Sequence, residues 1–109
     1  MEISFGNSKL QKLCEQSTKA QRELGADCAK KLRSRLADLM AAESVQDLVA
    51  GRPHPLEGDR QGQFSLSLAG AKRLVFEPAD EPMPVGEDGS IIWSKVTQVR
   101  IVFIGDYHD

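Results

Sequence analysis

The spacing of apolar residues changes once along this 109-residue chain, and that change limits which folds are open to it. Up to about residue 50, apolar residues recur every three or four positions, as they do on one face of a helix. From residue 63 onward they alternate with polar residues, as they do in half-buried strands. Helices are therefore expected first and a sheet second, which is the order of an α+β fold.

The clearest helical segment reads "CAKKLRSRLADLMAA" and starts just after Asp27, which we expect to be its N-cap. Leu32, Leu36, Leu39 and Met40 fall at i, i+4, i+7 and i+8, a single apolar stripe that we expect in the core. The N-terminal part also predicts a short strand over residues 2–5, a helix over 8–25 and a short helix over 44–49.

Three later segments predict strands. "QFSLSL" and "RLVFE" form a hairpin around the turn "AGAK", and "KVTQVRIVFIG", preceded by "IIW", is apolar on both faces toward its end and so belongs inside the sheet. Residues 78–90 hold three prolines and four acids and are expected to form a solvated loop. The fold class is thus α+β, with N-terminal helices packed on a twisted, mainly antiparallel sheet, in a single domain over residues 1–109.

Composition narrows the function classes. No apolar stretch approaches the roughly 20 residues of a membrane span, and the first residues lack the pattern of a signal peptide, so we expect a cytoplasmic protein. Cys14 and Cys28 have no paired spacing and are expected to be free, part-buried thiols. Residues 54–109 hold five Lys and Arg against nine Asp and Glu, so nucleic-acid binding would need a local basic patch.

The segment "HPLEGDR" places titratable groups directly before a strand. His54, Glu57, Asp59 and Arg60 lie within seven residues, at a position where a scaffold often presents its site residues. The competing interpretation is a turn that uses polar residues only to stay solvated.

Two further groups invite a chemical interpretation. Arg73 begins a strand, where its guanidinium either binds a phosphate or forms a cross-strand ion pair with Glu77 or another acid. Asp106, Tyr107 and His108 follow the last strand, either as groups that transfer protons or as a polar tail. A metal set drawn from His54, Asp59, His108 and Asp109 lacks ligand spacing, so we expect no metal.

Together, "HPLEGDRQGQFSLSL", "RLVF" and "DYHD" resemble the HigB-like toxins, a branch of the RelE/ParE superfamily of bacterial toxin–antitoxin systems. The resemblance covers residues 54–109. It implies a sheet whose concave face binds RNA, and cleavage of messenger RNA on the ribosome without a metal or other cofactor. It also implies a helix-turn-helix antitoxin as partner, with which a higher assembly can form.

The resemblance also assigns roles. In such cleavage the ribose 2′-hydroxyl attacks the adjacent phosphate, which needs a base, an acid and a positive charge. The residues that would carry this chemistry are Arg73 as phosphate clamp, His108 and Tyr107 as acid and base, His54 as a further proton carrier, and Asp106 as an orienting group. The residues that would add RNA contacts are Arg60, Lys72 and Arg100.

This sequence departs from the family pattern at two positions. Glu57 stands where a lysine is common, and Lys72 replaces an aromatic residue beside Arg73. Glu57 could serve as the base for the 2′-hydroxyl, or its negative charge could weaken RNA binding. Two alternatives therefore stay open: a non-catalytic member that inhibits a target such as gyrase or only binds an antitoxin, and an α+β domain with another role.

Overall fold

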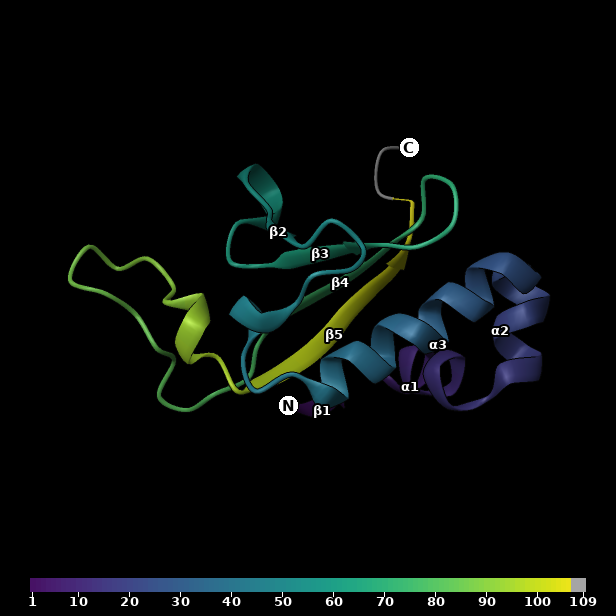
Figure 1. The fold of residues 1–109 in the computed structure, drawn as a ribbon, viewed down its shortest axis with the longest axis horizontal. Coiled ribbons are helices and arrows are strands. Elements are labelled where there is room, and N and C mark those ends of the chain that lie inside the picture. Colours follow the sequence, from purple (N-terminus) through teal and green to yellow (C-terminus); the bar gives the residue numbers. More distant parts are fainter. Residues whose placement is uncertain (107–109) are drawn as a thin grey trace.

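In the computed structural model, which describes residues 1–106, three helices follow the first strand and precede the other four strands of a five-stranded sheet (Figure 1). The helices are α1 (Ser8–Glu15), α2 (Ser17–Leu24) and α3 (Ala26–Ala41). The strands are β1 (Glu2–Phe5), β2 (His54–Pro55), β3 (Phe64–Ser67), β4 (Arg73–Pro78) and β5 (Gln98–Gly105). The predicted α+β class, the hairpin and the interior last strand are confirmed.

The sheet has the order β1-β5-β4-β3-β2. β1 runs parallel to β5, and the other neighbouring pairs are antiparallel. The nitrogen of Met1 donates hydrogen bonds to carbonyl oxygens of Leu39, Met40 and Ala42 at 2.7–3.0 Å, which ties the start of β1 to the end of α3. A register shift near Val75 and Phe76 marks a bulge between β4 and β5.

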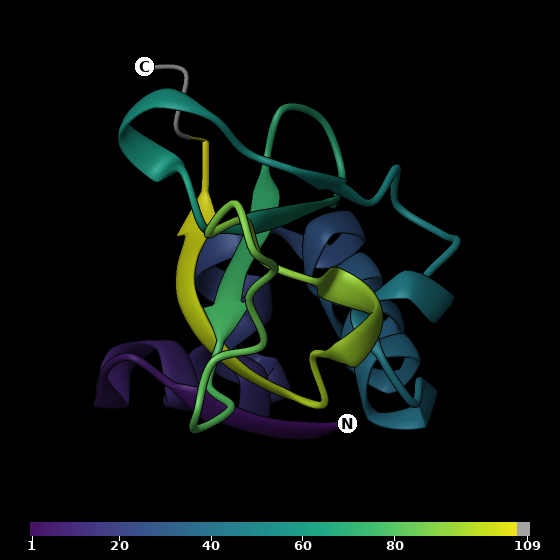
Figure 2. The same ribbon diagram turned by 90° about the vertical axis from the view of Figure 1, so that its left-hand side faces the viewer.

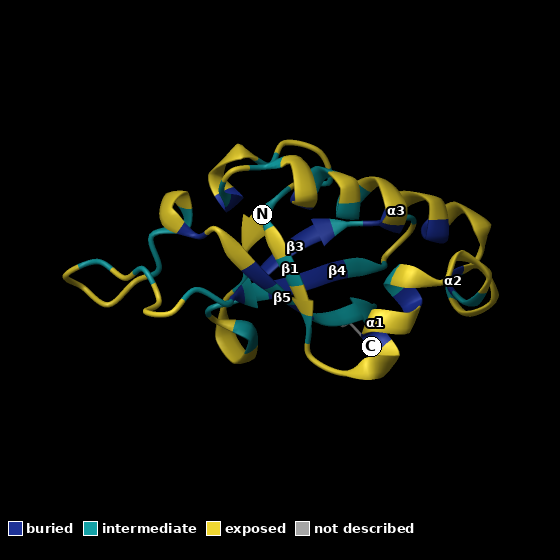
Figure 3. Cartoon of the chain, turned by 90° about the horizontal axis from the view of Figure 1, so that it is seen from below, coloured by how far each residue is buried: buried dark blue, intermediate teal, exposed yellow. Residues whose placement is uncertain are grey.

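The helices cover one face of the sheet, and the core lies between them. Leu32 and Leu39 of α3 pack with Leu66, Leu74 and Phe76 of the strands. Phe64 stacks on Phe76 with ring centroids 5.5 Å apart, and Trp93 closes the far end of this core against Phe64. Figure 3 shows the buried residues gathered on the strands and on the helix surfaces that face them.

Several helix boundaries differ from the prediction. The helix expected over 8–25 is broken at Gln16 into α1 and α2. Gly25, with φ 86°, occupies the cap position of α3, so Asp27 is not the N-cap but lies in the first turn, where it still faces the positive end of the helix dipole. Met40 is 67% exposed, because the start of β1 takes the place beside the last turn of α3.

The short helix expected over 44–49 is reduced to the 3-10 turn Val45–Asp47. Similarly, "IIW" leads into a 3-10 turn, Trp93–Lys95, and not directly into β5. The loop over residues 79–92 extends from the end of the sheet that is far from α2 (Figure 1). Asp80 fixes its first part, because its carboxylate accepts hydrogen bonds from the backbone of Thr97 and Gln98.

Both cysteines are free, as predicted: Cys28 is buried and Cys14 is half-buried. Burial, with a smaller effect of Glu15, raises the pKa of the Cys14 thiol to about 12, so this thiol stays protonated at neutral pH. Within the part of the chain that the structure describes, no helix is long and apolar enough to cross a bilayer.

Candidate nucleic-acid interface

The face of the sheet turned away from the helices carries two rows of facing residues. Residues that pair across antiparallel strands point to the same side of a sheet. One row runs across β2, β3, β4 and β5 and consists of His54, Ser65, Val75 and Phe103. The other row runs across β3, β4 and β5 and consists of Ser67, Arg73 and Gly105. The turn that contains Arg60 lies on this side and α3 on the other (Figure 2). Hereafter, the site face means the side of the sheet that holds these two rows.

Arg73 is the cation at the centre of the second row. Its Nη1 donates hydrogen bonds to the carbonyl oxygens of Lys72 at 3.0 Å and Gly70 at 3.4 Å, both in the preceding turn. Among residues 1–106, no carboxylate lies within ion-pair distance of its guanidinium. A cation that is held by neutral groups only can attract an anion such as a phosphate.

Arg60 is placed on the same face by an aromatic ring that sequence reasoning did not single out. It ends the 3-10 turn Gly58–Arg60, and its guanidinium carbon lies 4.5 Å from the centroid of the Phe103 ring. Its Nη1 also donates to Oε1 of Gln63 at 3.0 Å. The arrangement is a cation–π contact, with the plane of the guanidinium further fixed by the amide.

The ring of Phe103 leans toward Arg73. A Cβ at Gly105 would lie 3.3 Å from the ring atom Cζ of Phe103, so the ring covers the position where a side chain would stand. Gly105 faces Arg73 directly, and Phe103 is the diagonal neighbour of Arg73, at roughly 7–8 Å. Arg60, which contacts the Phe103 ring, and Arg73, which faces Gly105, therefore both lie toward the Gly105 end of the site face.

Glu57 belongs to the surroundings of Arg60. It immediately precedes the 3-10 turn, is exposed, and lines a surface hollow of about 460 Å³ together with Leu56, Asp59 and Arg60. Among the hydrogen bonds and ion pairs of residues 1–106, none joins Glu57 to Arg73. The structure thus brings Glu57 to Arg60, so that the two carboxylates of the predicted loop lie at the rim of the site.

His54 and Lys72 occupy the margins. His54 is exposed on the edge strand β2, with Nδ1 2.8 Å from the carbonyl oxygen of Arg52. Because β3 separates β2 from β4, His54 lies two strand spacings, roughly 10 Å, from the strand of Arg73. Lys72 is half-buried in the β3–β4 turn, where its carbonyl accepts from the backbone nitrogen of Leu68.

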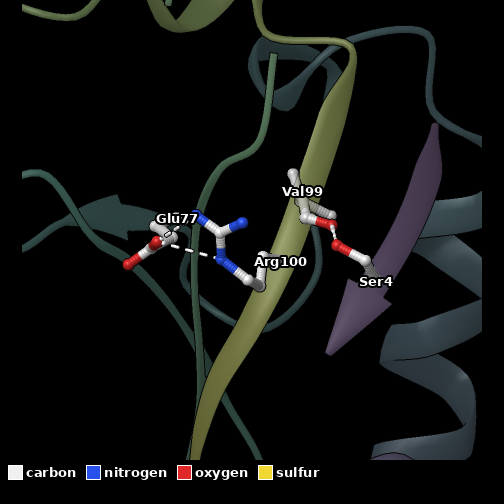
Figure 4. A network of polar contacts seen from close by, with 4 residues as sticks. All are labelled: Ser4, Glu77, Val99 and Arg100. Carbon is white, nitrogen blue, oxygen red and sulfur yellow. Dashed lines mark hydrogen bonds and ion pairs between the residues drawn. The ribbon is translucent and has the colours of Figure 1, made fainter. Parts of the chain in front are cut away.

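Arg100 lies on the site face but is paired. Glu77 faces it across β4 and β5, and one carboxylate oxygen, Oε2, accepts from both Nη2 and Nε of Arg100 (Figure 4). An ion pair between Arg73 and Glu77 is therefore wrong, since Glu77 binds Arg100 instead, and no other acid among residues 1–106 pairs with Arg73. The local reason is alternation along β4: Arg73 and Glu77 share a face but lie four residues apart.

Of the C-terminal residues Asp106, Tyr107 and His108, the structure describes only Asp106. Asp106 follows Gly105, the residue that faces Arg73. Tyr107 and His108 lie outside the described residues. Among residues 1–106, no group of three or more His, Cys, Asp or Glu side chains is arranged to hold a metal ion.

These features define a class of small α+β protein in which helices cover one face of a mainly antiparallel sheet and two arginines, Arg60 and Arg73, lie on the other. Two solved structures share this fold. A YoeB/ParE toxin from Agrobacterium tumefaciens aligns with a TM-score of 0.62 at 13% identity, over 98% of this chain and 99% of its own. A YoeB-YefM complex from Staphylococcus aureus aligns with a TM-score of 0.60 at 16% identity, over 98% of this chain and 97% of that one. No protein-family model matches the sequence, and no curated protein matches it either.

Proposed function

We propose that this protein is the toxin of a type II toxin–antitoxin pair and belongs to the RelE/ParE superfamily. The observation that carries the proposal is a fold shared with a YoeB/ParE toxin over 98% of the chain. The site face adds chemical support, because Arg73 has no carboxylate partner among residues 1–106 and Arg60 lies on the same face.

The activity that suits these groups is metal-free cleavage of messenger RNA on the ribosome, in the manner of a HigB-like toxin. A base takes the proton of the ribose 2′-hydroxyl, the 2′-oxygen bonds to phosphorus, and the bond to the 5′-oxygen breaks as an acid protonates that oxygen. The products are a 2′,3′-cyclic phosphate and a 5′-hydroxyl. Arg73 would offset the negative charge that builds on the phosphate oxygens.

The proton-transfer roles are proposed for residues at both ends of the site. Tyr107 and His108 come two and three residues after Gly105, which faces Arg73, and so serve as candidate acid and base. Asp106 would orient one of them. Glu57 is a second candidate for the base, because its carboxylate is exposed beside Arg60. His54 would have to act from the edge strand, through the RNA or through solvent.

The partner is proposed to be a helix-turn-helix antitoxin in the cytoplasm, able to form a higher assembly with the toxin. The structural neighbour from Staphylococcus aureus supports a protein partner, because it is a YoeB-YefM complex. Lys72 and Arg100 would add weaker RNA contacts around Arg73, Arg100 less so because Glu77 holds it.

The test is cleavage of messenger RNA on programmed ribosomes, with the 5′ ends mapped by primer extension. The parent protein should generate new ends, and Arg73→Ala should lower their yield roughly 100-fold or more. Lys95→Ala is the matched control, since it removes an exposed cation in a turn outside the site face. If Arg73→Ala and His108→Ala arrest bacterial growth as strongly as the parent, the proposed mechanism is wrong.

One observation favours a second function, which is inhibition by binding without cleavage. Residues 54–109 hold four more acids than bases, and Glu57 adds negative charge beside Arg60. A binding member would arrest growth, for example through gyrase, and leave ribosome-bound RNA intact. Growth arrest without new RNA ends, together with lost supercoiling activity of purified gyrase, would identify it.

A further inference from the structure

We propose that Arg60, laid on the ring of Phe103, is a stacking platform for one nucleobase of a single-stranded RNA whose phosphate binds Arg73. The inference rests on the proposed function in taking RNA as the ligand. In this inference the guanidinium of Arg60 recognises a base by stacking on it, and does not only attract RNA by its charge. Phe103 is the residue that positions this guanidinium.

The contacts of Arg60 hold its guanidinium as a plane. The guanidinium carbon lies 4.5 Å from the centroid of the Phe103 ring, and Nη1 donates to Oε1 of Gln63. Hydrogen bonds use the edge of a guanidinium, whereas stacking uses its surface. Arg60 also lines the hollow formed with Leu56, Glu57 and Asp59, so a base in that hollow can lie against the guanidinium. Guanidinium planes and aromatic rings are the groups on which proteins stack the bases of single-stranded RNA.

The hollow beside Arg60 suits a base better than a phosphate. Its other lining residues are the apolar Leu56 and the acids Glu57 and Asp59. Two carboxylates against one guanidinium make this hollow net negative, which repels a phosphate. A base is uncharged and planar, and its amino and ring N–H groups can donate to carboxylates. The volume of about 460 Å³ lies within the range typical of small-ligand sites, roughly 300–1,000 Å³.

Phosphate and base can be held together because Phe103, which contacts Arg60, also lies beside the strand position of Arg73. Phe103 is the diagonal neighbour of Arg73, and its ring leans over Gly105 toward it. A strand with its phosphate at Arg73 can therefore turn a base onto Arg60. In this arrangement Arg73 contacts the RNA backbone and Arg60 contacts a base.

The experiment uses the full chain and a short single-stranded RNA, with binding measured by fluorescence anisotropy. Arg60→Lys keeps the charge but removes the plane, so it should weaken binding about ten-fold or more, as Arg60→Ala does. It should leave the salt dependence unchanged, whereas Arg60→Ala should make it shallower. Lys95→Arg is the matched control, because it changes the type of cation in the exposed turn Trp93–Lys95, outside the site face, and should have little effect.

A second experiment changes the RNA and first uses the parent protein. The same RNA carrying one abasic nucleotide, scanned along its length, should bind the parent protein about ten-fold more weakly at one position. Arg60→Lys should then show no further loss with that RNA. Phe103→Leu, with its fold checked by circular dichroism, should behave as Arg60→Lys does.

Two results would overturn the inference: Arg60→Lys binding as tightly as the parent, or no abasic position that matters, including the case in which the parent binds no RNA. Either failure can be told apart from failure of the proposed function. Cleavage on ribosomes without any dependence on a base at Arg60 would leave the proposed function standing. Base-dependent binding without cleavage would support the platform and count against the nuclease.

Discussion

Glu77 and Arg100 face each other across β4 and β5, and a single carboxylate oxygen accepts from the guanidinium at 2.6 and 3.1 Å (Figure 4). Both side chains stay partly exposed, at 30% and 42%. The pair neutralises one end of the site face, whereas Arg73 and Arg60 lie at the other. Among residues 1–106, no carboxylate pairs with Arg73, so its charge near Gly105 is not offset in this way, whereas Glu77 neutralises Arg100.

Releasing Arg100 should strengthen RNA binding. Glu77→Gln leaves a neutral acceptor beside the guanidinium, so the site face gains one net positive charge. We expect tighter binding of single-stranded RNA and a steeper salt dependence. The free energy of unfolding should fall by no more than about 1 kcal/mol, because the ion pair is solvent-exposed and screened. Anisotropy titrations at several salt concentrations and urea denaturation measure the two effects.

The control for this variant is Glu87→Gln, which changes the net charge equally in the exposed loop. If both variants strengthen binding to the same extent, the effect belongs to overall charge, and the Glu77–Arg100 pair has no special role.

Two adjacent residues of α3 test how this helix packs on the sheet. Leu39 is fully buried and Met40 is 67% exposed, although both fit the same helical stripe. Leu39→Ala should lower the free energy of unfolding by about 2–5 kcal/mol. Met40→Ala should change it by less than about 0.5 kcal/mol. Both are measured by urea denaturation, and a loss of several kcal/mol for Met40→Ala would mean that α3 is rotated relative to the sheet.

Met40 also shows why part of the fold was predictable and part was not. The alternation in "QFSLSL" and the two-sided apolar run in "KVTQVRIVFIG" are local consequences of strand geometry, so these strands and their hairpin could be predicted. The exposure of Met40 depends on β1, which pairs in parallel with β5 from the other end of the chain. Local periodicity contains no information about such a distant partner.

Part of the candidate site could likewise be predicted from the sequence, and part could not. Residue type and position were enough to single out Arg73 and the loop before β3, and the structure places Arg73 and Arg60 on one face. The support that Phe103 gives to Arg60 was missed, because the two residues meet only after the sheet forms. A signal existed: Phe103 is a bulky aromatic residue two positions before a glycine at the strand end, where its ring has room.

Asp80 should make stability depend on pH. Desolvation raises the pKa of this carboxyl, but hydrogen bonds from the Thr97 hydroxyl and from the backbone of Gln98 and Thr97 outweigh it and hold the pKa below its usual value. Because the folded pKa is depressed, the stabilisation is present above the unfolded pKa of about 3.9 and is lost as pH falls through the folded pKa.

Asp80→Asn should therefore cost about 1 kcal/mol at pH 7, a value reduced by the exposure of the carboxylate to solvent. The difference from the parent should shrink as pH falls below about 4. Urea denaturation between pH 7 and pH 2.5 measures it. Asp88→Asn is the comparison, since Asp88 bonds only Ser90 within the loop and should matter little. A constant difference at every pH would contradict the electrostatic explanation.

Gly105 should prove essential to the placement of Arg60. It has φ 152°, a conformation that other residues rarely adopt, and an added Cβ would lie 3.3 Å from Cζ of Phe103. In Gly105→Ala the backbone strain should cost roughly 1–3 kcal/mol of stability. The ring must also move by a few tenths of an ångström, so its contact with Arg60 weakens and RNA binding should fall. Urea denaturation and anisotropy on the same samples measure the two effects.

The strain and the ring displacement can be separated with Gly89→Ala. Gly89 has φ 83° and no atom within 4 Å of its would-be Cβ, so this variant carries backbone strain without moving the site. We expect it to lose stability but to bind RNA as the parent does. If Gly105→Ala also keeps full RNA affinity while it loses stability, then Phe103 does not hold Arg60 in its binding position.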